Sequence, residues 1–200
     1  MTLEGHDSIA IDLPGHGARS HEQFTWRGAL DAIDQAVESC SAPPLLVGLS
    51  LGGYSSLAYA ARNHGKIAGV MLSGCSTEIR GKPVAAYRRL YIRVAQAFRP
   101  TSSTWPVVTD MLAAVSGHSS LADLERLLIP VWLVNGQRDI LRMDERRYLA
   151  VLPQAQLTVV PNAGHDVNSH APIAFNRILL GALHELRVAN VALARAPTRS

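Results

Sequence analysis

The stretch Val47-Gly48-Leu49-Ser50-Leu51-Gly52-Gly53 carries more information than any other part of this chain. It follows the apolar run 44–47, which is typical of a short buried strand, and precedes residues 54–61, which favour a helix. A serine between glycines at such a junction requires a sharp turn that holds Ser50 in strained backbone geometry, with its hydroxyl above the sheet. We expect side chains at positions 48 and 52 to collide with neighbouring backbone, and Gly53 to let the helix pack closely on the strand.

The pattern is the Gly-x-Ser-x-Gly nucleophile elbow. Its backbone chemistry adds a second candidate, because the N–H of Leu51 lies at the helix N-terminus, where it would face a developing oxyanion. Five residues can also match by chance, as an ordinary glycine-rich turn. The strand before the motif and the helix after it favour the functional interpretation.

The composition is that of an ordinary globular domain, with 48% hydrophobic and 18% charged residues in a chain of 200. The two cysteines, Cys40 and Cys75, form neither a disulfide framework nor a C-x-x-C pair, so we expect a reducing, cytoplasmic compartment. No apolar run approaches the ~20 residues of a membrane helix, and the first residues do not resemble a secretion signal.

The charge pattern and the spacing of potential metal-ligating residues indicate which kinds of partner the protein could bind. A net charge of +3 without a basic stripe interleaved with aromatic residues gives little support to nucleic-acid binding. The sequence contains no His, Cys and Asp cluster with metal-ligand spacing, so we expect no metal and no cofactor. A small acyl compound is the expected partner, and the sequence leaves the oligomeric state open.

Short apolar runs alternate with longer amphipathic ones along most of the chain. We expect helices between most of the predicted strands, including one that Thr25 caps and a last one that begins near Pro172. This alternation predicts an α/β fold, with a mostly parallel sheet covered by helices on both faces. The predicted strands are Ser8–Asp12, Pro44–Gly48, Ile67–Leu72, Pro130–Asn135 and Gln156–Val160.

Residues 77–128 interrupt the alternation, because three helical patterns follow one another there without a strand. We predict a helical lid over 77–128, a core formed by 1–76 and 129–187, and a frayed tail over 188–200. A capping box, Ser120 to Asp123, would open the third lid helix, whose buried stripe includes Leu128. The lid residues expected to line a substrate pocket are Tyr87, Tyr91, Phe98, Trp105 and Met111.

A serine hydroxyl needs a base within hydrogen-bond reach, and that base needs an orienting acid. Both must lie at the carboxyl edge of a parallel sheet, where Ser50 lies. Asp139, after the strand at 130–135, suits the acid, and Asp144 is its rival but resembles a helix N-cap. His165, after the strand at 156–160, suits the base. His170 lies nearer the next helix, and we interpret the six other histidines as surface residues.

Four segments together resemble the α/β-hydrolase superfamily: Asp12 to Ser20, the elbow around Ser50, Gly136 to Asp139, and Gly164-His165. The chain order Ser, Asp, His is also that of the family. The resemblance implies that Ser50 is the nucleophile, Asp139 the acid and His165 the base. It also implies that Gly15-His16-Gly17 forms a structural turn.

One departure from the family pattern is large. In the family, the strand that ends at the Asp12 turn is the fourth of eight, so roughly 50–60 residues would precede it at ordinary element lengths. The absent third strand would lie between 8–12 and 44–48, so we expect either a gap in the sheet there or the 8–12 strand sliding across to fill it. Leu51 would be the only evident oxyanion donor, and losing one donor costs about 10²–10³ in turnover. We therefore expect a truncated hydrolase with impaired activity.

Three functions remain open on the sequence. The first is a serine hydrolase that cleaves a small ester or related acyl compound through an acyl-enzyme. The second keeps the three residues but changes the reaction, as in cofactor-free perhydrolases, C–C bond hydrolases and acyltransferases of this superfamily. The third is a hydrolase-like binding protein without chemistry, which the incomplete oxyanion hole favours and the complete Ser, Asp, His set opposes.

Overall fold

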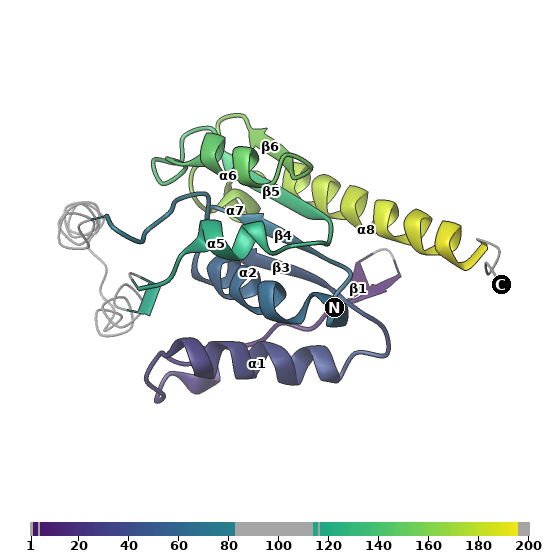
Figure 1. The fold of residues 1–200 in the computed structure, drawn as a ribbon, viewed down its shortest axis with the longest axis horizontal. Helices are drawn as coiled ribbons and strands as arrows, with labels where there is room; N and C mark the ends of the chain where they lie inside the picture. Colours follow the sequence, from purple (N-terminus) through teal and green to yellow (C-terminus); the bar gives the residue numbers. More distant parts are fainter. Residues whose placement is uncertain (1, 4, 83–113, 116, 196–200) are drawn as a thin grey trace.

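A computed structural model describes residues 2–3, 5–82, 114–115 and 117–195. Its centre is a parallel sheet with the strand order β3-β4-β5-β6, and helices cover both faces (Figure 1). This confirms the predicted fold class. The strands are β3 (Leu45–Leu49), β4 (Gly69–Ser73), β5 (Val131–Gly136) and β6 (Gln156–Val160).

The strand register brings all four carboxyl ends to one edge of the sheet. Leu49 pairs with Ser73, Ser73 with Val134, and Val134 with Thr158. Loops that leave these ends therefore meet at a common edge, the usual place for ligands in open parallel sheets.

The central strands are buried on both faces, and their side chains alternate between two cores. Val70 and Leu72 of β4 pack into the larger core, whereas Met71 between them packs into the smaller one. The larger core is covered by α1 (Trp26–Glu38), α2 (Leu51–Asn63), α5 (Ser120–Glu125) and α6 (Glu145–Val151). The smaller core is covered by α7 (Val167–His170) and α8 (Pro172–Arg195).

The predicted N-cap residue is correct for α1 and wrong for α5. Thr25 caps α1, because its hydroxyl accepts the Gly28 N–H at 3.0 Å. The cap of α5 is Ser119, whose hydroxyl accepts the Ala122 N–H, so the prediction of Ser120 is wrong. The Ser120 hydroxyl instead donates to the buried Glu78 carboxylate at 2.8 Å.

Residues 8–12 do not form the predicted strand. They follow a two-stranded hairpin, β1 (Thr2–Leu3) with β2 (His6–Asp7), which is a separate sheet. Within the described residues, β3 pairs with β4 alone and forms an edge of the main sheet. A strand requires a neighbour that takes its hydrogen bonds, and a pocket separates residues 8–11 from β3. The predicted gap is therefore present, and the 8–12 segment has not crossed it.

Three further predictions need correction, and a fourth concerns residues outside the description. Leu128 is 82% exposed and does not belong to a buried stripe, since α5 ends at Glu125. Residues 188–195, expected in a frayed tail, continue α8 to Arg195. His118 is not a surface residue, because its ring is half-buried against Trp26 and bonds to Asp123. The predicted pocket residues Tyr87, Tyr91, Phe98, Trp105 and Met111 all lie outside the described residues.

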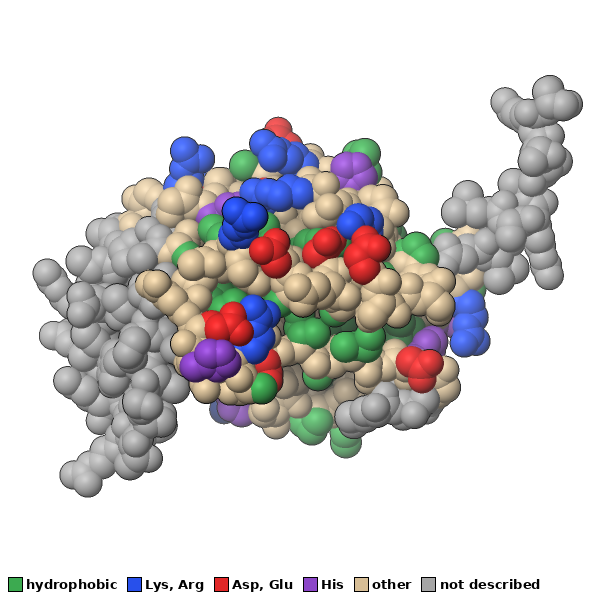
Figure 2. Space-filling model, turned by 90° about the horizontal axis from the view of Figure 1, so that it is seen from below, with side chains coloured by type: hydrophobic (Ala, Val, Ile, Leu, Met, Phe, Trp, Pro, Cys, Tyr) green, Lys and Arg blue, Asp and Glu red, His purple; other side chains and the backbone are tan. Residues whose placement is uncertain are grey.

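Acidic and basic side chains are interspersed on the face shown in Figure 2, rather than gathered by sign. In the part of the chain that the structure describes, no helix combines the length and the apolarity that crossing a bilayer requires.

Candidate active site

Ser50 lies in the tight turn between β3 and α2, at the N-cap of the helix. Its φ of 50° and ψ of −115° are unusual, because a side chain rarely tolerates a positive φ. Two hydrogen bonds fix the turn: the Ser50 N–H donates to the Ser73 carbonyl at 2.8 Å, and the Ser50 carbonyl accepts from the Tyr54 N–H at 3.0 Å. The predicted strain at Ser50 is thus observed, and the side chain is half-buried at the sheet edge.

The three glycines of the turn differ in whether their surroundings would admit a side chain. A Cβ at Gly48 would lie 2.3 Å from the Gly52 carbonyl oxygen, so backbone excludes any side chain there. A Cβ at Gly53 would lie 2.6 Å from Sγ of Cys75, which is why α2 packs so closely on the sheet. A Cβ at Gly52 would meet nothing within 4 Å, so the collision predicted for this position is wrong.

Leu51 is the first residue of α2, and its side chain packs into a small core with Phe24, Ala29 and Val115. The first N–H groups of a helix have no partner within the helix, and together they favour negative charge. The Leu51 N–H is next to the Ser50 side chain in the chain. This placement suits a donor to an oxyanion formed at Ser50, as the sequence predicts.

Asp139 follows β5 by three residues and is held in a closed turn. Its N–H donates to the Gly136 carbonyl at 3.1 Å, and its Oδ1 accepts the Leu141 N–H at 2.8 Å. The side chain is 1% exposed. Its second oxygen, Oδ2, lies 3.0 Å from Nδ1 of His165.

His165 lies in the loop after β6, with its side chain 29% exposed. The hydrogen bond that His165 donates to Asp139 raises the pKa of His165. Burial lowers this pKa by less, and the charges of Asp139 and Asp166 raise it further. When Nδ1 carries a proton toward Asp139, Nε2 is the basic nitrogen of the neutral ring. A base held in this way is what a neighbouring serine hydroxyl requires.

The end of β4 links Ser50 to His165. Ser73 accepts the Ser50 N–H, and the next residue, Gly74, lies against the His165 imidazole. A Cβ on Gly74 would lie 3.0 Å from Cε1 and 3.1 Å from Nδ1 of that ring. The nucleophile candidate and the base candidate therefore contact consecutive residues of one strand end.

The rival residues take other positions. Asp144 precedes α6, as the N-cap interpretation requires, but its carboxylate makes no cap bond. It accepts the Glu78 N–H at 2.9 Å and pairs with Lys82 and Arg147. Burial opposes the charge of Asp144, yet these three partners keep its pKa below the usual range.

His170 ends α7, and its Nδ1 accepts the Gly164 N–H at 3.2 Å. His170 therefore stabilises the loop that carries His165, and His165 remains the candidate base. Among the described residues, no group of His, Cys, Asp and Glu side chains could hold a metal ion.

The Gly15-His16-Gly17 stretch forms a compact turn that leads into a 3₁₀ helix, Gly17–Arg19. The Asp12 carboxylate accepts the Ala18 N–H at 2.9 Å, and Gly15 and Gly17 both have positive φ. These contacts are local and structural, as the sequence analysis expects.

Two residues at the site were not singled out from the sequence. Gly74 has a φ of 61° and leaves room for the His165 ring, and Asp166 adds negative charge beside that ring. A glycine directly after a predicted strand was an available signal for Gly74. Asp166 carried no separate signal, because acidic residues before short helices are common.

Comparisons with known proteins identify the family. The sequence matches the alpha/beta hydrolase family over residues 2–178. It is 30% identical over 184 residues to a pimeloyl-[acyl-carrier protein] methyl ester esterase of Xanthomonas campestris pv. campestris, an alignment that covers 82% of this chain and 72% of the esterase.

The human protein ABHD14A is 26% identical over 190 residues; the match covers 93% of this chain and 56% of ABHD14A, so the chain spans little more than half of that relative. A bromoperoxidase from Bacillus anthracis shares the fold with a TM-score of 0.67 at 19% identity, over 86% of this chain and 80% of the bromoperoxidase. The chain belongs to the alpha/beta hydrolase family.

Proposed function

We propose that this protein is a serine hydrolase that cleaves a small ester or a related acyl compound. In this proposal Ser50 is the nucleophile, His165 the general base and Asp139 the acid that orients it. The observation that carries the proposal is the 3.0 Å contact between His165 Nδ1 and Asp139 Oδ2, at the same edge of the sheet as the Ser50 turn.

The proposed reaction has two steps, acylation of Ser50 and hydrolysis of the acyl-enzyme. Nε2 of His165 takes the Ser50 hydroxyl proton as the oxygen attacks the acyl carbon. The carbonyl oxygen becomes negative and is stabilised by the Leu51 N–H at the start of α2. The protonated imidazole then donates to the leaving alkoxide, which completes the acyl-enzyme. Water, deprotonated by His165, releases the acid and regenerates Ser50.

Asp139 stabilises the imidazolium that forms during both steps. Its side chain is almost fully buried, so water screens the attraction little. Its Oδ1 is occupied by the Leu141 N–H, which fixes the carboxylate and leaves Oδ2 for His165.

The ester as substrate class is supported by a relative that is 30% identical, an esterase named for a methyl ester. The mechanism itself requires only an acyl carbon with a leaving group.

The decisive test is covalent labelling. A fluorophosphonate probe should modify the wild-type protein on Ser50, identified by peptide mass spectrometry. The variant Ser50→Ala should lose the label, and Ser55→Ala, which removes a buried hydroxyl one turn along α2, should keep it. Hydrolysis of p-nitrophenyl acetate should follow the same pattern.

Two results would contradict the proposal. Equal labelling of wild type and Ser50→Ala would remove Ser50 from the mechanism. A folded wild-type protein that neither labels nor hydrolyses any ester in a panel of acyl lengths would favour the hydrolase-like binding protein instead.

A further inference from the structure

Segment 76–78 follows the carboxyl end of β4 and lies along the loop that follows β5. The Ser76 carbonyl accepts the Asp144 N–H at 3.0 Å, and the Glu78 N–H donates to the Asp144 carboxylate at 2.9 Å. Thr77 lies between these two contacts and is only 2% exposed. Its carbonyl and its hydroxyl both have partners, and these partners belong to two different parts of the candidate active site.

The Thr77 carbonyl is held by the helix that follows the nucleophile candidate. It accepts the hydroxyl of Tyr54, on α2, at 2.8 Å, and this hydrogen bond is buried. The N–H of Tyr54 in turn donates to the Ser50 carbonyl at 3.0 Å. Tyr54 therefore connects the Ser50 turn to Thr77 through two hydrogen bonds.

The Thr77 hydroxyl is held by the turn that carries the acid candidate. It donates to the Leu141 carbonyl and accepts the Met143 N–H at 3.3 Å. The N–H of Leu141 donates to Oδ1 of Asp139 at 2.8 Å. Leu141 thus uses one main-chain group for Thr77 and the other for Asp139, which connects the two residues.

Apolar packing holds only part of the 139–143 turn. The side chains of Ile140 and Met143 are 61% and 53% exposed, so their burial contributes little to where the turn lies. Polar contacts therefore set much of its position, and Thr77 supplies two of them from a buried site. A displaced turn would release Oδ1 of Asp139, and the carboxylate would then be free to rotate away from His165.

We propose that Thr77 is a positioning residue, which fixes the Asp139 carboxylate relative to His165 by tying α2 to the 139–143 turn. This inference rests on the proposed function, in which Asp139 orients the base. Thr77 acts through Leu141 rather than on the substrate. A threonine suits this role because one hydroxyl can both donate and accept, and because burial strengthens its hydrogen bonds.

The pKa of His165 reports the position of the Asp139 carboxylate. The hydrogen bond to Asp139 is the largest cause of the raised pKa of His165, and the charges of Asp139 and Asp166 add to it. NMR titration of isotope-labelled histidine measures this pKa, with the His165 signals assigned by their absence in His165→Gln. The measurement needs neither substrate nor turnover, so it is independent of whether the protein is an esterase.

Thr77→Val is the central variant, because valine nearly keeps the shape of threonine and removes the hydroxyl. The pKa of His165 should fall by roughly 0.5–1 pH unit, the equivalent of one weakened hydrogen bond. The kcat of p-nitrophenyl acetate hydrolysis should fall roughly 10–100-fold with little change in KM, because the base is misplaced. Thr77→Ser keeps the hydroxyl and should retain both values.

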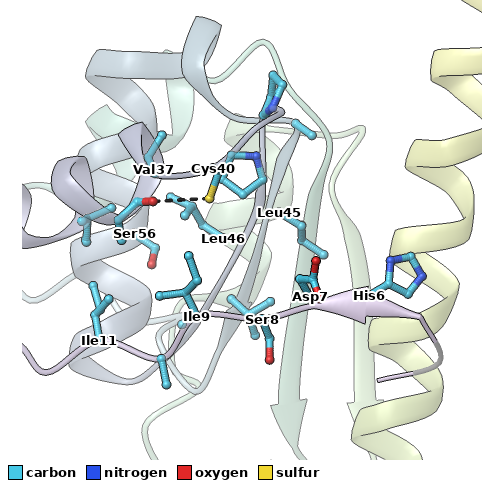
Figure 3. A pocket seen from close by; sticks show the side chains of 18 of the residues that line it. His6, Asp7, Ser8, Ile9, Ile11, Val37, Cys40, Leu45, Leu46 and Ser56 are labelled. Carbon is cyan, nitrogen blue, oxygen red and sulfur yellow. Dashed lines mark hydrogen bonds between the residues drawn. The ribbon is translucent and has the colours of Figure 1, made fainter. Parts of the chain in front are cut away.

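A matched pair on α2 tests the other half of the connection. Tyr54→Phe removes the hydroxyl that holds the Thr77 carbonyl, and it should also lower the pKa of His165. Ser56→Ala removes a hydroxyl from the same helix, at a residue that lines the pocket beside β3 (Figure 3), and should leave that pKa unchanged. This pair decides the question if Thr77→Val does not fold.

A destabilised control separates positioning from a general loosening of the fold. Leu152 is 3% exposed and packs in the larger core, at the far end of α6 from Asp144. Leu152→Ala should lower the melting temperature and leave the pKa of His165 unchanged in the folded protein.

Three results would overturn the proposal. An unchanged pKa of His165 in folded Thr77→Val would show that the turn holds Asp139 without Thr77. Equal pKa values in Tyr54→Phe and Ser56→Ala would remove α2 from the connection. An equal fall of this pKa in Leu152→Ala would show that any loss of stability moves the carboxylate.

Failure of the proposed function gives a different result. A wild-type protein without esterase activity, in which Thr77→Val still lowers the pKa of His165, would contradict the hydrolase proposal and support the positioning role of Thr77.

Discussion

Nδ1 of His165 lies 3.0 Å from Oδ2 of Asp139, although 26 residues separate them in the chain. The contact exists because β5 and β6 are adjacent and parallel, so the loops after them leave the same sheet edge. Gly136 makes the approach possible, since a Cβ there would lie 2.0 Å from the Gly164 carbonyl oxygen. The contact between Asp139 and His165 therefore depends on the adjacency of β5 and β6 and on the absence of a side chain at position 136.

Asp139→Asn should lower kcat of ester hydrolysis by about 10⁴-fold, because an amide favours the wrong imidazole tautomer. The fold should persist, since the amide retains the size of the carboxylate and can still accept the Leu141 N–H. Steady-state kinetics and circular dichroism check both statements. An activity loss of less than tenfold in a folded variant would remove Asp139 from the proposed role.

Activity should fall at acidic pH with a midpoint above the usual histidine value. His165 acts as a base only when neutral, and the Asp139 hydrogen bond raises its pKa despite partial burial. The protonated, inactive form therefore persists to higher pH than in a free imidazole. The pH dependence of kcat/KM reports this limb.

The same profile distinguishes the contribution of Asp166. Asp166→Asn should move the acidic limb to lower pH, because it removes one of the charges that raise the pKa of His165. Asp31→Asn makes the same charge change on α1, at an exposed ion pair with Arg27, and should leave the limb in place. Identical profiles for all three proteins would show that the Asp166 charge has no effect.

Two glycines of the Ser50 turn should respond oppositely to alanine. Gly48→Ala forces a Cβ to within 2.3 Å of backbone and should destabilise the protein by about 1–3 kcal/mol or more. A Cβ at position 52, which lies within α2, would meet no atom within 4 Å. Gly52→Ala should therefore leave the free energy of unfolding unchanged or raise it by up to about 1 kcal/mol. Urea unfolding measures both, and equal destabilisation would contradict this account of the turn.

The two cysteines should differ in reactivity. Burial raises the pKa of Cys75 to about 12, and the nearby Asp139 charge adds to the effect. The native protein should therefore take one iodoacetamide, at the half-buried Cys40, whereas the urea-unfolded chain should take two. Intact-mass spectrometry counts the adducts, and rapid labelling of Cys75 in the native state would show that α2 opens from the sheet.

Features of this protein that depend on local chemistry could be predicted without the structure. Thr25 was identifiable as a cap because capping involves only residues three apart. The elbow was identifiable because a serine between glycines, after a strand and before a helix, requires one backbone geometry. The alternation of strands and helices indicated the parallel sheet, and with it the edge where Asp139 and His165 meet.

Features that depend on neighbours distant in the chain could be recognised only from the folded arrangement. Ser120 matches the capping pattern, yet Glu78 occupies its hydroxyl and Ser119 caps the helix. Gly52 borders the pocket beside β3, and a Cβ at this position would meet no atom within 4 Å. Residues 8–12 have the apolar pattern of a strand, but a strand forms only where another offers its hydrogen bonds, and here a pocket separates them from β3.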